Sequence, residues 1–223
     1  MATTFVGKPL PRLEDARFLT GQATFTADLD LPDQAHAVVV RSPHAHAAIE
    51  RVELAAARAA PGVLAVYTGA DLGAAGIGAI PSLTRTPPFR FANADGTEMA
   101  DASQYPLALE RVRYVGEPVA VVVAETLAQA RDAADLVEVH YRPLPVVTTI
   151  DGALAEGAPL LWPESPRNRS FHWEVGDREA VAAQLRSAAH VVDLEVEYPR
   201  EIVAFMEPRA AIGSYDRAES RYT

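Results

Sequence analysis

Two histidines separated by one residue, His44 and His46 in the stretch SPHAHA, are the first candidates for chemistry in this sequence. In an extended segment, this spacing places both rings on the same face of the chain. Imidazole is a common ligand of zinc, copper and iron. A metal site needs a third and a fourth ligand, however, and the next histidine upstream is His36. The pair therefore indicates a structural turn or an interface more than a metal site.

Acidic residues supply the next group of candidates. Glu117 in YVGEPVA could act as an acid or a base, but Gly-Glu-Pro is also typical of a tight turn that aims the following strand. We favour the turn. The other acidic groups occur at helical or alternating spacing, which is typical of solvated faces. They are Asp132 and Asp135, and Asp193, Glu195 and Glu197.

The stretch FMEPRAAIGSYD places Glu207 and Arg209 on either side of Pro208. Proline biases the preceding residue towards an extended conformation. The carboxylate and the guanidinium could pair with each other, or could border a polar cofactor. The residues alone favour the structural interpretation.

The sequence motifs that indicate a complete catalytic or cofactor-binding site are missing. The glycines of GAAGIGAIP match neither a dinucleotide-binding nor a Walker pattern, and GxSxG and HExxH do not occur. The residues alone therefore indicate an α+β protein in two parts, without a complete active site.

A strand–helix–strand unit dominates the middle of the chain. Val119–Ala124 is a continuous apolar run, typical of a strand covered on both faces. Thr126 and Gln129 match a capping box for the helix that follows. Small apolar residues continue at helical spacing, and Val137–Tyr141 predicts the return strand. We expect a right-handed parallel crossover.

The flanking elements are less regular. Residues 47–69 predict a strand, a short helix and a strand at Val63–Tyr67, and residues 73–105 predict a long loop. Strands are also expected at Thr24–Asp28 and Ala35–Arg41, joined by a turn.

The last third of the chain begins near Ile150. Asp177 is a good N-cap for a helix through Ala189. Its apolar positions are expected to face inward, and long strands are expected at 190–200 and 202–216. Without partners, these strands would leave apolar edges exposed. The inward positions are Val181, Leu185, Ala188 and Ala189.

Composition narrows the class of function. The net charge is -10, and the acidity lies mostly in the second half, which argues against a nucleic-acid surface and an anionic membrane surface. No apolar run approaches the ~20 residues of a membrane span. The N-terminus does not look like a secretory signal. The chain has no cysteine, which excludes disulfides and thiolate metal sites within it. We expect a cytoplasmic protein.

An ordered series of stretches carries a family resemblance. The chain resembles the N-terminal part of the molybdenum-cofactor-binding large subunit of the xanthine dehydrogenase / aldehyde oxidase / carbon monoxide dehydrogenase family. The stretches are GKPLPRLEDARFLTGQATFTADLDLP, AHAVVVRSPHAHAAI (the family's first core hairpin), PGVLAVYTGADL, RVRYVGEPVAVVVAETLAQARDAADLVEVHYRPLPVV and FMEPRAAIGSYD.

The resemblance implies an α+β fold. Residues 1–17 would be an N-terminal extension, residues 18–149 an α/β-hammerhead domain, and residues 150–223 the incomplete start of the molybdopterin-binding domain. YVGEPVAVVVAET would then be hammerhead scaffold that helps to wall a substrate channel or a subunit contact.

The resemblance also implies an oxidoreductase that oxidises a small carbon substrate with oxygen from water. The molybdenum-pterin cofactor would be held mostly outside this chain, with iron–sulfur clusters and FAD on partner domains or subunits. Glu207 and Arg209 are carried over only as cofactor-proximal residues, and no catalytic residue or metal ligand is assigned in this chain. By itself, the chain is expected to be inactive.

Two other interpretations stay open. The chain could be a stand-alone hammerhead module for protein interaction, without enzymatic activity. It could also be a small metalloprotein that uses His44 and His46.

Overall fold

The computed structural model describes residues 6–82, 91–100, 102–199, 201–205, 207 and 209–223. The chain divides into two units: residues 35–191 form one, and residues 1–34 with 192–223 form the other. The predicted divisions at 17/18 and 149/150 rest on the resemblance to longer proteins, and they stay a prediction.

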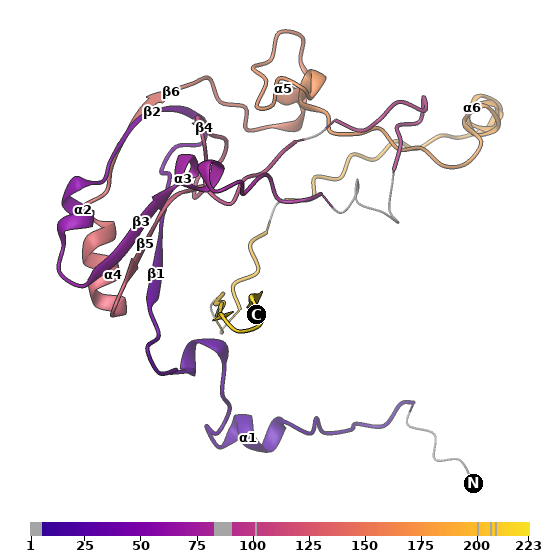
Figure 1. Cartoon of the computed structure of the whole chain (residues 1–223). Helices are drawn as coiled ribbons and strands as arrows, with labels where there is room; N and C mark the ends of the chain where they lie inside the picture. Colours follow the sequence, from indigo (N-terminus) through magenta and orange to yellow (C-terminus); the bar gives the residue numbers. More distant parts are fainter. Residues whose placement is uncertain (1–5, 83–90, 101, 200, 206, 208) are drawn as a thin grey trace. The chain divides into compact units, whose positions relative to one another are not determined.

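The unit of residues 35–191 contains the two main sheets and most of the helices (Figure 1). Short helices follow or separate the strands, as the Ala-rich and Pro-Gly stretches indicate. Its elements are β1 (His36–Arg41), β2 (Ala47–Glu53), α2 (Ala55–Ala59), β3 (Val63–Thr68), α3 (Gly69–Ala74), β4 (Arg111–Val112), β5 (Pro118–Ala124), α4 (Leu127–Ala134), β6 (Glu138–Pro143), α5 (Ile150–Leu154), the 3-10 helix η2 (Pro166–Asn168) and α6 (Arg178–Ser187).

Two three-stranded antiparallel sheets form the framework, in the orders β1-β5-β3 and β4-β2-β6. The predicted parallel crossover is wrong, because β5 and β6 belong to different sheets. Both edges of β5 are already paired, with β1 and β3, so β6 pairs with β2 instead. The expected hairpin over residues 35–49 is wrong for the same reason: β1 pairs with β5, whereas β2 pairs with β4 and β6.

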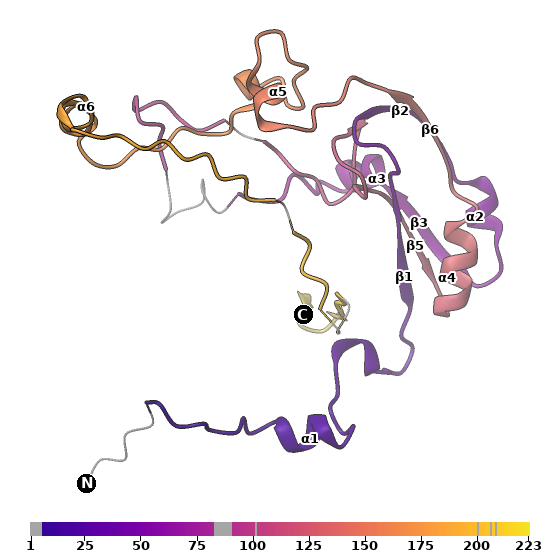
Figure 2. The same cartoon turned by 180° about the vertical axis from the view of Figure 1, so that it is seen from behind.

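Helices α2 and α4 pack against the sheet of β1, β5 and β3 (Figure 2). The core between them contains the buried side chains of Ala57, Val66, Val122 and Ala133. Alanines on α4 bring the helix close to the strands, as their helical spacing predicts. The N-cap at Thr126 is confirmed, since the backbone N–H of Gln129 donates to Thr126 Oγ1 at 3.2 Å. The reciprocal half of the predicted capping box is replaced by a bond from the Thr126 hydroxyl to Gln129 Oε1 at 2.9 Å.

The second sheet has its own core, which includes one residue of the first sheet. Ala47, Ala108 and Val112 are buried together with Val119, which lies on β5. Partly buried apolar side chains of β2 and β6 pack around them. Since β5 contributes to both cores, the two sheets are parts of one packed body.

The expected loop over residues 73–105 is mostly irregular, apart from the end of α3 and isolated bridges between Ile80 and Gln104 and between Ala92 and Glu98. Residues 83–90 and 101 lie outside the described part. Backbone hydrogen bonds from Ala94 to His172 (2.7 Å) and from Ala100 to Ser170 (2.9 Å) connect this loop to the chain before α6.

Helix α6 begins where the sequence predicts. The backbone N–H of Ala180 donates to Asp177 Oδ1 at 2.8 Å. The expectation of an inward apolar face is wrong: Val181 is 58% exposed and Leu185 54%, and α6 buries no residue. Apolar residues at helical spacing show which side chains share one face of the helix. This spacing does not show whether another part of the chain packs against that face.

The other unit has little regular structure. It contains α1 (Asp15–Leu19), the 3-10 helix η1 (Thr26–Asp28), β7 (Tyr215–Asp216) and β8 (Arg221–Tyr222). The strand expected at 24–28 is wrong, because this stretch is η1, closed by a hydrogen bond from the Phe25 N–H to Asp28 Oδ2 (2.9 Å). The short polar side chain of Asp28 thus accepts a hydrogen bond from the local backbone, and such bonds compete with strand formation.

The long strands expected at 190–200 and 202–216 are also wrong. Among the described residues of these stretches, only 215–216 are in a strand. We call the described residues 191–199 and 201–205 the apolar segment. Its large apolar side chains are all exposed, for example Leu194 at 83% and Ile202 at 93%. A strand needs a neighbouring backbone to pair with, and the described chain provides none here. No helix among the described residues is long and apolar enough to cross a membrane.

Candidate functional site

The placement of Glu207 and Arg209 near a cofactor stays a prediction. Glu207 and Arg209 are both exposed, and neither has an ion-pair partner among the described residues. Their neighbours Met206 and Pro208 lie outside the described part. In this chain the described residues around them do not provide the converging polar groups that a pterin would require.

His44 and His46 play different parts in one turn. The ring of His44 packs against Tyr141, with 4.8 Å between ring centroids. His46 is buried, and its Nδ1 donates to the carbonyl oxygen of Pro145 at 2.8 Å. Its Nε2 has no hydrogen-bond partner within the described part of the chain. Among the described residues, no third histidine or carboxylate lies close enough to the pair to complete a group of metal ligands. The contacts of the two rings are those of a structural turn.

Glu117 closes the turn that precedes β5, as its sequence context predicts. Gly116 has a φ of +88°, a left-handed conformation that favours glycine. Reciprocal backbone hydrogen bonds join the turn to Ser42: Gly116 N–H donates to Ser42 at 2.7 Å, and Ser42 N–H donates to Glu117 at 2.9 Å. The side chain of Glu117 folds back and accepts a hydrogen bond from the backbone N–H of Arg113. The turn is therefore fixed by both main chain and side chain.

A hollow of about 310 Å³ lies beside this turn. Glu117, only 8% exposed, is the buried charged residue in its wall. Arg113 crosses the hollow's edge, where its Nε donates to the carbonyl oxygen of Leu161 at 2.9 Å. Its guanidinium lies 5.1 Å from the centre of the Trp162 ring. The indole N–H of Trp162 in turn donates to the carbonyl oxygen of Ser103 at 3.1 Å.

Burial decides the electrostatics of this hollow. Desolvation raises the pKa of Glu117, and the Arg113 backbone N–H and guanidinium oppose that shift. Desolvation likewise lowers the pKa of Arg113, which the Glu117 carboxylate opposes. Burial and the Glu117 charge raise the pKa of Tyr114, which lies in the same turn. The Glu117 carboxylate and the Arg113 guanidinium thus influence each other in a place that solvent only partly reaches.

A buried carboxylate with a raised pKa is a feature of many acid–base catalysts. Here Glu117 already accepts a main-chain hydrogen bond, and the residues of the hollow include no serine, cysteine or histidine arranged as a nucleophile–base pair. The contacts of Arg113 with Leu161 and Trp162 suit a structural role, in which they hold the β4–β5 turn against residues 161–165. We call this group of contacts the wall of the hollow. Sequence reasoning identified the turn but missed this wall, because Arg113 and Trp162 are 49 positions apart and share no motif.

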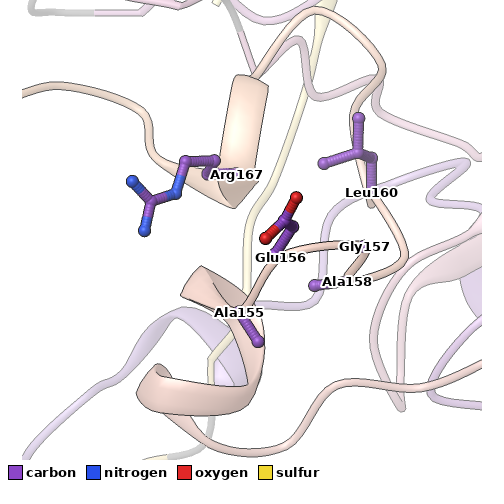
Figure 3. A pocket seen from close by; sticks show the side chains of 6 residues that line it. All are labelled: Ala155, Glu156, Gly157, Ala158, Leu160 and Arg167. Atoms are coloured by element: carbon purple, nitrogen blue, oxygen red, sulfur yellow. The ribbon is translucent and has the colours of Figure 1, made fainter.

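A second hollow of about 570 Å³ lies between the end of α5 and η2 (Figure 3). Two of its lining side chains, Glu156 and Arg167, are charged. The guanidinium of Arg167 donates to the Leu154 carbonyl oxygen at 3.0 Å, which satisfies the C-terminal end of α5. Its other lining residues are Ala155, Gly157, Ala158 and Leu160. With so few polar groups, this hollow offers little to orient a substrate.

Residues 20–145 match the family model described as the a/b hammerhead domain of aldehyde oxidase and xanthine dehydrogenase. The matched range contains both main sheets, α2 to α4 and the Glu117 turn. It is more than half of the chain.

Curated relatives align over almost all of this chain. The nicotine 6-hydroxylase large subunit of Paenarthrobacter nicotinovorans is 37% identical over 97% of the chain and 25% of its own length. The carbon monoxide dehydrogenase large chain of Afipia carboxidovorans is 33% identical over 95% of the chain and 26% of its own length. The chain therefore spans about a quarter of the length of these relatives.

Solved structures agree with these matches. A Cu,Mo-CO dehydrogenase in its carbon monoxide reduced state is 35% identical, with a TM-score of 0.67 over 82% of this chain and 23% of that one. Quinoline 2-oxidoreductase from Pseudomonas putida 86 is 39% identical, with a TM-score of 0.57 over 69% of this chain and 18% of that one.

Proposed function

The chain belongs to the aldehyde oxidase and xanthine dehydrogenase family through its α/β-hammerhead domain, and on this premise we propose that it serves as the N-terminal segment of a molybdenum hydroxylase large subunit. In this role the hammerhead is scaffold. It supplies a wall of the substrate channel and surfaces for the rest of the enzyme, and it is inactive alone.

One observation supports this proposal above the others. The apolar segment exposes alternate side chains, Val192 (89%), Leu194 (83%), Val196 (71%) and Tyr198 (90%), with acidic residues between them. Alternation of this kind is the pattern of a strand with one buried face. A contiguous exposed apolar surface is typical of a protein–protein contact. We infer that strands of the remaining molybdenum-binding domains, or of a partner subunit, pair with this segment.

The reaction of the assembled enzyme is proposed as oxidation of a small carbon substrate, with water as the source of oxygen. The names of the relatives point to different substrates, nicotine for one protein and carbon monoxide for another. Similarity of this chain to both is consistent with a scaffold whose sequence does not select the substrate.

The molybdenum-pterin cofactor would be held mainly by residues outside this chain. We propose Glu207 and Arg209 only as neighbours of that cofactor, since both are exposed in the described structure. Iron–sulfur clusters would sit on partner domains or subunits, because cysteine thiolates ligate such clusters and this chain has no cysteine. We also propose FAD on partner domains or subunits, as the family resemblance implies. We also propose the cytoplasm as the compartment, which cell fractionation would test.

Affinity purification from the organism that makes the chain tests the proposal. The tagged 223-residue chain should bring down a polypeptide that carries molybdenum and pterin in stoichiometric amounts. Serine substitutions on the apolar face of the segment should abolish this association, because the partner then gains no apolar burial. The substitutions are Val192→Ser, Leu194→Ser and Val196→Ser.

The matched control lies on the opposite face of the same segment. Serine at the acidic positions should leave the association intact, since those side chains would face solvent in the paired strand. The control positions are Asp193, Glu195 and Glu197. Partners without molybdenum would favour the stand-alone interaction module instead. Equal loss of association in both triple variants would contradict strand pairing through this face.

A further inference from the structure

Four charged or titratable side chains meet on the solvent face of the second sheet. In the β2–β6 ladder, Arg51 lies opposite His140, and Glu53 lies opposite Glu138. Alternation along each strand places these four on one face, while Val52 and Val139 between them pack towards the core. The ligand atoms of Glu53, Glu138 and His140 all lie within 4.8 Å of one another. We call these three residues the β2–β6 cluster.

Like charges directly opposite each other destabilise a strand pair. The carboxylates of Glu53 and Glu138 are in that position, so a cation beside them stabilises the strand pair. In the described structure, Arg51 provides it: its Nη2 lies 2.6 Å from Glu53 Oε1.

Only one of the two close neighbours of His140 Nε2 can form a hydrogen bond with it at a time. Its Nε2 lies 3.0 Å from Arg51 Nη2 and also 3.0 Å from Glu53 Oε1. The guanidinium can only donate and the carboxylate can only accept. A protonated Nε2 opposes the arginine, and an unprotonated Nε2 opposes the carboxylate, so one of the two contacts is unfavourable in every protonation state.

A divalent metal ion resolves this conflict. It accepts the Nε2 lone pair and the carboxylate oxygens together, and it neutralises the two facing carboxylates. Zinc binds imidazole nitrogen and carboxylate oxygen at about 2.0–2.2 Å in tetrahedral sites, which frequently keep one position for water. We propose that Glu53, Glu138 and His140 bind one divalent transition-metal ion of the zinc type, and that Arg51 then moves into solvent. The side chain of Arg51 is 63% exposed and is free to do so.

Zinc titration of the full 223-residue chain, stripped of metal with a chelator, tests this proposal. Calorimetry and competition with a chromogenic chelator should show one zinc ion per chain, and cobalt should give a tetrahedral absorption spectrum. His140→Ala should weaken zinc binding by at least about tenfold, an effect that even outer-shell partners can reach. Glu138→Gln should weaken it in the same direction, and Arg51→Ala should not weaken it.

His172→Ala is the matched control. His172 is also exposed and also lies near a glutamate, with Nε2 3.9 Å from Glu174, but it has no second carboxylate beside it among the described residues. Its loss should leave zinc affinity unchanged. The proposal is overturned if the wild-type chain binds no stoichiometric zinc, if His140→Ala binds as tightly as wild type, or if His172→Ala weakens binding equally. The exchanged side chains are exposed or, at His140, partly exposed, so circular dichroism should show unchanged folding.

Discussion

The hydrogen bond between the Glu117 carboxylate and the Arg113 backbone N–H allows a sharp stability prediction. Glu117→Ala removes the acceptor and leaves a partly buried N–H without a partner, at a cost of about 1–3 kcal/mol. Glu117→Gln keeps an amide oxygen in the same place. The free energy of unfolding of Glu117→Ala should therefore be lower than that of Glu117→Gln by about 2 kcal/mol.

The same pair of variants predicts a pH dependence. Burial raises the pKa of Glu117 above its ordinary value of 4.5, so the folded protein binds this proton more tightly than the unfolded chain does. Glu117 then contributes stability that is fully present below about pH 4.5 and is lost as pH rises through the raised pKa. Glutamine does not titrate. The stability of Glu117→Gln relative to wild type should therefore increase as pH rises from 4.5.

Thermal unfolding followed by circular dichroism measures both effects. For a unit the size of residues 35–191, about 2 kcal/mol corresponds to a melting temperature lower by about 4–8 °C. Indole fluorescence of Trp162, which lines the same hollow, reports whether the site itself has changed. Equal melting temperatures for the alanine and glutamine variants would refute the role of the hydrogen bond. A glutamine variant whose stability runs parallel to wild type at every pH would refute the raised pKa.

Three further predictions concern other parts of the chain. Gly69→Ala should destabilise the protein by about 1–3 kcal/mol, because a Cβ there would lie 2.4 Å from the Ala108 backbone oxygen. In the control Gly73→Ala, in the same helix, the new Cβ has no heavy atom within 4 Å, so this variant should be neutral or stabilising in denaturant titrations. Asp177→Ala should remove an N-cap worth about 1 kcal/mol. Because α6 buries no residue, amide hydrogen exchange in α6 should become faster while the melting temperature of the protein stays constant. A lowered melting temperature would contradict the exposed position of α6. Trp162→Phe keeps a ring beneath the arginine but loses the indole N–H bond, so it should cost about 1 kcal/mol by chemical denaturation; a cost near zero would mean that this bond has no net value.

Local signals in the sequence predicted local structure well. The side chains of Thr126 and Asp177 both accept the backbone hydrogen bonds expected of N-caps, because a cap depends only on residues within one turn. The turn at Gly116 followed from the same kind of argument, and its φ of +88° confirms it. The family resemblance gave the fold class, which the family model and the solved structures confirm.

Strand pairing was harder to predict, because it depends on partners far away in the sequence. The apolar run of β5 indicates burial on both faces, which is complete on the face of Ala120, Val122 and Ala124 and only partial on the face of Val121 and Val123. The run does not reveal that β1 and β3 occupy its two edges. The alternation over residues 190–200 predicts a strand, yet pairing requires a backbone that the described chain does not place there. Pattern alone cannot identify what an apolar face will cover.

The candidate site shows the same limit. Glu117 was found as a turn residue, whereas its burial and its partners Arg113 and Trp162 were not anticipated. The glutamate between a glycine and a proline, directly before an apolar strand, was the available signal. The β2–β6 cluster was missed because Glu53 and His140 become neighbours only through the ladder that joins β2 to β6.

We call residues 35–191 the hammerhead unit. Among its described residues, six strands alternate strictly between two sheets along the chain: β1, β3 and β5 in one, and β2, β4 and β6 in the other. No strand of this unit pairs with its immediate successor, so every ladder joins segments at least some fifty residues apart. Such a topology folds slowly, because long loops must close before any pairing is gained. During synthesis, a nascent chain that ends before Arg111 contains no complete strand pair of this unit. The hammerhead unit should therefore fold late during synthesis and in a single cooperative step. If the unit is cut into two halves, neither half should fold by itself.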